Sequence, residues 1–336
     1  LSLAGSGAGG VGGEGALTGS GDAGYNGAIT LTSPTTIGVG PLGTDTLTLG
    51  GAVAGAGMAM TKVGTGTLEL TKASTYGTTT IDAGMLTLSG LGTLGLSAAT
   101  VKSGATLHLN GVNLTAPPNL SLAGSGVGGE GALTGSGVAG YNGAITLASP
   151  TSIGVGPLGT DTLRLGRAIG GAGSLTKEGA GTLTLSNANT YAGGSIIKAG
   201  VLIPQVNNAL GAGGVSIAST GTLQLGTVTL ANPVSLDGGA LRATGLAVLT
   251  GIVGQTKDGT LSSADSLASL SLQGTFSGGS HALNISGPGR FSLVGGASGL
   301  ASLHLAEDSR LDLGSDQRII SSGAQTYLGA VTGTRT

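Results

Sequence analysis

The densest group of charged residues in this sequence is an acidic cluster: Glu307, Asp308, Asp312 and Asp316. Paired carboxylates cleave glycosidic bonds as acid and base, so a carbohydrate-active enzyme is one hypothesis that this cluster raises. Arg310 and Arg318 interleave with the acids, which favours cross-strand ion pairs on a solvated face. Asp312 alternates with Leu311 and Leu313, as an outward-facing strand residue does. We therefore interpret the cluster as structural and nominate no catalytic residue.

The three histidines are widely separated, at His108, His281 and His304. His108 and His304 each lie between two leucines, a pattern typical of an outward-facing strand position. No spacing relates them as metal ligands or as members of a catalytic triad. The chain also has no cysteine. The sequence thus predicts no catalytic, cofactor-binding or metal site, and no cofactor.

Two glycine-rich stretches have the form of ligand-binding loops. GSGAGG at 5–10 fits the spacing of a dinucleotide-binding loop, but no helix pattern follows it. GGVGGEG at 9–15 is similar to a calcium-binding nonapeptide, which needs acids in successive turns. Here Glu14 is the one acid, and Glu130 repeats it more than a hundred residues later. Both stretches are better interpreted as turns.

The five tyrosines recur at matching places in the repeats described below. Tyr25, Tyr141 and Tyr327 form one set, and Tyr76 and Tyr191 form another. They could be a stacking platform for sugars. We favour a structural role, in which each ring covers a corner of the core and its hydroxyl lies in water.

The composition indicates what must position these residues. Glycine supplies 71 of 336 residues and charged residues only 8%, whereas hydrophobic residues reach 39%. Disordered chains have the opposite balance, so many short strands separated by tight turns are expected. The net charge is −2 and no basic run occurs, which argues against nucleic-acid binding. No run of about 18 apolar residues is present, so we expect no membrane insertion by this segment.

A long internal repeat organises the chain. Residues 11–53 and 127–169 are identical at 37 of 43 positions. A degenerate third copy begins near Val234, where ANPVSL resembles the earlier APPNLSL at 116–122. The predicted long units are 1–119, 120–233 and 234–336. Because Leu1 lies inside a motif that recurs later, we expect the chain to be a segment of a larger protein.

A shorter period lies within each long unit. Leu-x-Leu pairs begin at Leu47, Leu68, Leu86 and Leu107, with spacings of 21, 18 and 21 residues. This alternation predicts strands with one buried face, and stacked coils of about 20 residues would bury that face. The fold prediction is all-β: a single continuous right-handed parallel β-helix over 1–336, in which Leu68, Leu183 and Leu223 are buried. Arg164 replaces Thr48 between copies, which places that position outside.

Two segments carry a recognisable motif: TKVGTGTLELTKASTYGTTTIDAGML at 61–86 and TKEGAGTLTLSNANTYAGGSIIKAGVL at 176–202. They resemble the autotransporter-associated β-strand repeat of bacterial passenger domains. The first copy departs from the pattern at Ser74 and is one residue short after Tyr76. Residues 320–331, 24–29 and 140–145 are similar to repeats of large haemagglutinin-like surface proteins. The resemblance implies a parallel β-helix, export across the outer membrane and a surface role.

Three functional hypotheses follow. The first is a non-catalytic structural or adhesive rod on the bacterial surface or outside the cell, mediating attachment or biofilm cohesion through contact with host surfaces or polysaccharide. The second is a self-assembling extracellular filament or sheath, because 8% charge is low for a free rod and self-association would cover the surface. The third is a carbohydrate-active β-helix enzyme. Electron micrographs would separate the first two, and an activity screen on polysaccharides would test the third.

Overall fold

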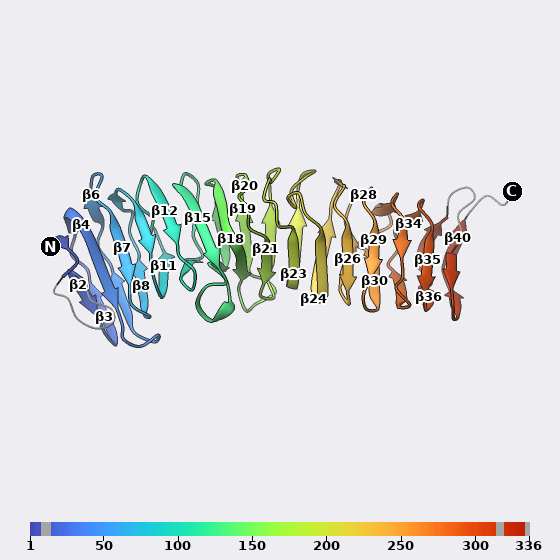
Figure 1. The fold of residues 1–336 in the computed structure, drawn as a ribbon, viewed down its shortest axis with the longest axis horizontal. Coiled ribbons are helices and arrows are strands. Elements are labelled where there is room, and N and C mark those ends of the chain that lie inside the picture. The colour runs from blue at the N-terminus through green and yellow to red at the C-terminus, as the bar shows by residue number, and fades with distance from the viewer. Residues whose placement is uncertain (8–14, 314–318, 333–336) are drawn as a thin grey trace. The chain divides into compact units, whose positions relative to one another are not determined.

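The computed structural model describes residues 1–7, 15–313 and 319–332. The chain forms two compact units, unit 1 over Leu1–Gly181 and unit 2 over Thr182–Thr336. Every strand pairing in the described part of both units is parallel, and each strand lies beside the matching strand of the next coil (Figure 1). The chain is therefore an all-β parallel β-solenoid, as predicted. Apart from a short 3₁₀ helix at Val127–Gly129, the described residues contain no helix, and none of them forms a segment able to cross a membrane as a helix.

Unit 1 has three ladders of stacked strands. Ladder 1A contains β2 (Leu17–Gly19), the second half of β4 (Ile29–Val39), β7 (Met60–Val63), β10 (Thr79–Ile81), β12 (Ala98–Val101), β15 (Asn119–Gly124), the first half of β18 (Ile145–Val155) and β20 (Ile169–Gly170). Ladder 1B contains β3 (Asp22–Tyr25), β5 (Thr46–Leu49), β8 (Thr67–Leu70), β11 (Met85–Ser89), β13 (Thr106–Asn110), β16 (Leu133–Ser136), the second half of β18 and β21 (Leu175–Glu178).

Ladder 1C is interrupted. Its first part contains β1 (Ser2–Gly5), the first half of β4, β6 (Val53–Gly55) and β9 (Thr75–Tyr76), and its second part contains β14 (Asn113–Leu114), β17 (Val138–Tyr141) and β19 (Thr162–Leu165). Residues 96 and 97 continue the first part by hydrogen bonding to 76 and 77. In the described structure, no backbone hydrogen bond joins 93–96 to 113–116.

Corresponding strands of the two copies of the long repeat lie in different ladders. β2 lies in ladder 1A, whereas its repeat β16 lies in ladder 1B. β5 lies in ladder 1B, whereas its repeat β19 lies in ladder 1C. One repeat is therefore not a whole number of coils, and the second copy is displaced by one face.

Unit 2 also has three ladders. Ladder 2A contains β22 (Thr182–Leu185), the second halves of β23 (Ser195–Pro204) and β24 (Val215–Leu225), β27 (Ala240–Ala243), β30 (Gly259–Ser263), β33 (Ala282–Ser286), β36 (Ser302–Leu305) and β39 (Gln325–Tyr327). Ladder 2B contains the first halves of β23 and β24, β26 (Val234–Asp237), β29 (Val253–Gln255), β32 (Phe276–Ser277), β35 (Ala297–Leu300) and β38 (Ile319–Ser321). Ladder 2C contains β25 (Thr229–Leu230), β28 (Leu246–Leu249), β31 (Ser269–Leu272), β34 (Arg290–Leu293), β37 (Arg310–Asp312) and β40 (Ala330–Thr332).

The core follows the predicted alternation. Leu68, Leu183 and Leu223 have no exposed surface, and each lies opposite another leucine in an adjacent coil. Leucine partners are 18 or 21 residues apart in the regular coils of unit 1, since Leu68 pairs with Leu47 and Leu86. Stacking places a leucine on a leucine at the strand spacing of about 4.8 Å, which removes both from water. Arg164 points outward, as the change from Thr48 predicts.

Candidate functional site

A hollow of about 550 Å³ in unit 1 is the place where titratable and hydroxyl side chains gather. It exists because the coil between Leu107 and Leu133 is 26 residues long and carries an additional loop, 125–131. Thr106 fixes the loop, because its hydroxyl accepts from the Val127 N–H at 2.9 Å and donates to the Gly131 carbonyl at 2.9 Å. The loop holds Glu130 at the edge of the hollow.

Glycine forms the floor of this hollow. A Cβ on Gly154 would lie 2.1 Å from the Glu130 carbonyl oxygen, so the loop can approach ladder 1B only where residue 154 has no side chain. Gly135 and Gly156 also line the hollow. The loop that carries Glu130 is the repeat of the glycine-rich stretch at 9–15, for which a turn was predicted. Most of the matching stretch at 9–15, including Glu14, lies outside the described residues.

His108 lies at one wall of the hollow within a chain of hydrogen bonds. Its Nδ1 is 2.8 Å from the Thr134 hydroxyl, and its Nε2 is 3.2 Å from the Ser136 hydroxyl. Ser136 in turn donates to Asn110 Oδ1 at 3.2 Å. Burial lowers the pKa of His108, while the charges of Asp161 and Glu130 oppose that shift. The lowered pKa favours the neutral imidazole at neutral pH, in which one ring nitrogen donates and the other accepts.

The hydrogen bond that Ser136 donates to Asn110 bears on catalysis. A serine nucleophile needs a histidine nitrogen that accepts its proton, and a carboxylate that orients the opposite nitrogen. Here Asn110 Oδ1 accepts the hydrogen bond of the Ser136 hydroxyl. The Thr134 hydroxyl lies beside Nδ1 of His108, where a catalytic triad has its carboxylate. The arrangement is suited to binding a hydroxyl-bearing ligand beside Glu130 and Glu178. Among the residues that the structure describes, no group of three histidine, cysteine or acidic residues could hold a metal ion.

The C-terminal acidic cluster is split between elements. Glu307 and Asp308 lie exposed in a turn, and Asp312 lies on β37. Asp316 and Arg318 lie outside the described residues. Arg310 is opposite Arg290 and Ala330, so the predicted cross-strand ion pair of Arg310 is wrong for the part of the chain that is described. The prediction failed because it considered neighbours in sequence and not the residue one coil away.

The remaining histidines stay apart from one another. His304 is exposed on β36, opposite Asn284 and Thr326. His281 has its Nδ1 3.8 Å from a carboxylate oxygen of Asp258. Neither lines the hollow beside His108.

The tyrosine prediction was wrong in one respect. Tyr76, Tyr141 and Tyr191 are buried and their hydroxyls bond to other protein groups, whereas Tyr25 is half-buried and Tyr327 is exposed. Tyr76 bonds to Thr79 at 3.0 Å and Tyr191 to Ser195 at 2.6 Å. Desolvation raises the pKa of all three phenols. Their faces are therefore not available for stacking sugars.

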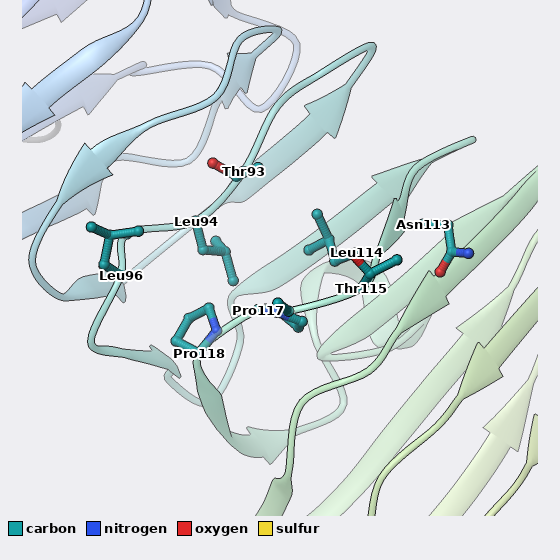
Figure 2. Close-up of a pocket in the computed structure, with 10 residues that line it drawn as sticks. Thr93, Leu94, Leu96, Asn113, Leu114, Thr115, Pro117 and Pro118 are labelled. Atoms are coloured by element: carbon teal, nitrogen blue, oxygen red, sulfur yellow. The ribbon is translucent and has the colours of Figure 1, made fainter.

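A second hollow, of about 300 Å³, lies at the interruption of ladder 1C. Figure 2 shows Leu94 and Leu96 on one of its two segments and Leu114, Pro117 and Pro118 on the other. Its lining is mostly apolar, and none of the residues that line it is titratable. It could accommodate a small apolar group, and it has no titratable side chain that could act as an acid or a base.

Sequence reasoning missed two buried lysines. Lys62 and Lys177 occupy matching positions in β7 and β21 and have no exposed surface. The Lys62 ammonium donates to the carbonyls of residues 63, 64 and 83 at 2.8–3.0 Å, and Lys177 donates to those of 178 and 179 at 2.7–2.8 Å. Gly64 takes a φ of 78°, which turns its carbonyl toward the ammonium. Burial lowers the pKa of each lysine to about 8.

A buried aspartate in each copy of the repeat was also missed. Asp45 accepts from the N–H groups of Gly21 and Leu42, both at 2.8 Å. Asp161 accepts from Gly137 at 2.7 Å and from Leu158 at 3.0 Å. Each carboxylate thus closes its own turn and joins it to the preceding coil. Both copies contain the sequence PLGTD, at 41–45 and 157–161, and this identity could have indicated a shared turn.

Comparison with protein families gives one match. Residues 60–88 and 175–203 match the passenger-associated-transport-repeat. Neither the curated proteins nor the solved structures gave a match. The two matched segments begin at β7 and β21 and include both buried lysines and two of the buried tyrosines.

Proposed function

We propose that this chain, which carries two passenger-associated transport repeats of the kind found in autotransporter passengers, is a structural and adhesive segment of a protein exported by a bacterium. Its place is the outer surface or the extracellular space. The observation that carries the proposal is the occurrence of the repeat at matching positions within a parallel β-solenoid. We also propose that the role is non-catalytic, which is supported by the Ser136 hydroxyl donating to Asn110 in the polar hollow.

The fold supports this role physically. A solenoid buries its leucines in coils and leaves alternate residues of every strand for contact with other molecules. The chain has no cysteine, and hydrogen bonds between the paired strands of neighbouring coils hold the solenoid together in place of disulfides. Each unit presents regular outward columns of side chains along its ladders, which favours many weak contacts over one enclosed pocket.

Adhesion is tested by coating beads with the purified chain and measuring their attachment to epithelial cells and to bacterial biofilm. Attachment above that of beads coated with an unrelated β-solenoid supports the proposal. Equal attachment of both coatings contradicts it.

A second candidate function is self-assembly into filaments. Charged residues make up only 8% of the chain, and Leu91, Leu158 and Leu267 are exposed at sites away from the chain ends. A surface with few charges and exposed apolar side chains favours association between copies. Sedimentation velocity over a range of concentrations would show oligomers growing with concentration, whereas a monomer at all concentrations would contradict self-assembly.

A further inference from the structure

The outward face of ladder 2C carries polar side chains, among them two arginines on adjacent strands. Strands β31, β34 and β37 alternate buried apolar residues with outward polar ones. Along the stack, one outward column is Ser269, Arg290, Arg310 and Ala330, and the adjacent column is Ser271, Ser292, Asp312 and Thr332. The face is thus a strip of hydroxyls with two arginines in register.

The two arginines are direct neighbours on adjacent strands. Arg290 pairs in register with Arg310, and both are exposed. Adjacent strands are about 4.8 Å apart, and like charges directly opposite each other destabilise a sheet. Together with Asp312, Ala330 and Thr332 they line a hollow of about 240 Å³.

The described surroundings do not neutralise this pair. Neither Arg290 nor Arg310 forms an ion pair with any residue that the structure describes. Glu307 and Asp308, in the turn before β37, make no such pair either. Asp312 is the one acid lining the hollow in the described part, so the site retains a net positive charge.

The chemistry of the strip selects a class of ligand. A guanidinium binds a carboxylate or sulfate through two parallel hydrogen bonds, and two guanidiniums one strand apart can clamp one such group or two successive ones. Serine and threonine hydroxyls beside them can donate to and accept from sugar hydroxyls. Nucleic acid and anionic lipid suit the face poorly, because they require more cations than two, and the chain has a net charge of −2.

We propose that the outward face of ladder 2C binds an acidic polysaccharide, with Arg290 and Arg310 contacting its carboxylate or sulfate groups. The inference rests on the proposed adhesive function and gives it a ligand class. The adjacent column, with hydroxyls at Ser271, Ser292 and Thr332, runs along the stack beside the arginines, so a linear chain of sugars lies along the strip and crosses successive strands.

Binding of the full chain to polygalacturonate, dextran sulfate and unmodified dextran, measured by biolayer interferometry, tests the proposal. We expect binding to one or both acidic polymers and none to dextran; which one binds distinguishes carboxylate from sulfate. Arg290→Ser and Arg310→Ser should each weaken binding about ten-fold or more. Arg242→Ser removes an exposed arginine from ladder 2A and should leave binding unchanged.

Folding is checked by thermal unfolding, where Arg290→Ser should keep or raise the midpoint because it removes a like-charge contact. Unchanged affinity in both variants, equal binding of dextran, equal loss in Arg242→Ser, or equal binding of single-stranded DNA would each overturn the site. If coated beads still adhere to cells while the acidic polymers do not bind, this inference fails and the adhesive function stands.

Discussion

Raising the pH from 8 to 10 should stabilise unit 1 through Lys62 and Lys177. Burial lowers the pKa of each to about 8, against an ordinary value of 10.5. Between these values the unfolded chain binds more protons than the folded chain, so the free energy of unfolding increases with pH. The full difference corresponds to about 3 kcal/mol per lysine.

The buried tyrosines set the upper limit of the pH range in which the free energy of unfolding increases. Burial raises the pKa of Tyr76 to about 12, from an ordinary value of 10.0, and raises those of Tyr141 and Tyr191 as well. Their contribution is complete below about pH 9 and is lost as the pH rises toward their folded pKa values. Between pH 8 and 10 each lysine should add about 2 kcal/mol, whereas each tyrosine should remove about 0.4 kcal/mol near pH 10, so the free energy of unfolding still increases.

Urea unfolding followed by circular dichroism at pH 8, 9 and 10 measures this effect. Lys62→Met should remove about half of the increase, and the double variant with Lys177→Met should remove nearly all of it. Both variants also leave backbone carbonyls without a donor and should be less stable overall, so the dependence on pH is the decisive readout. Lys72→Met, at an exposed position, is the control and should keep the full increase. A wild-type stability that is level between pH 8 and 10, or a double variant that keeps the increase, would refute the reasoning.

Three further predictions concern stability and catalysis. Leu183→Ala should lower the free energy of unfolding by about 2–5 kcal/mol in urea titrations, whereas Thr184→Ala on the outward side should change it by about 0.5 kcal/mol or less. Asp161→Asn should cost about 1–3 kcal/mol in the same assay, because one of two backbone N–H groups loses its acceptor; an unchanged midpoint would show that the turn does not need the carboxylate. Asp312→Asn combined with Asp316→Asn should leave the release of reducing sugar from polysaccharides at the wild-type level, and abolition of a measured release would support an enzyme.

The fold was predictable because the solenoid repeats one simple rule. Leu47, Leu68 and Leu86 recur at nearly constant spacing, and their alternation with Thr and Glu fixes which side is inside. Stacking then follows, since no coil buries its leucines alone. The direction in which the coil turns stays a prediction, as do the continuity of the solenoid over 1–336 and the three long units.

What the sequence did not reveal are features that depend on the neighbouring coil. Lys62 was overlooked because a charge suggests an outward position, although its parity with the buried Met60 indicated the inside. The pairing of Arg290 with Arg310 could have been predicted, because they are one coil apart in the sequence. It was overlooked because the acidic residues around Arg310 suggested ion pairs instead. The polar hollow could not be predicted from the sequence, because a glycine such as Gly154 does not indicate which segment packs against it.

The displacement of the long repeat by one face has a genetic consequence. Segments 11–53 and 127–169 are similar enough to recombine, which would add or delete 116 residues. Such an event preserves the pairing, because β18 meets β20 and β21 as β4 meets β6 and β7. It also turns everything downstream by one face. A lineage that gains or loses one repeat thereby changes the direction in which its later surface residues point, without altering any of those residues.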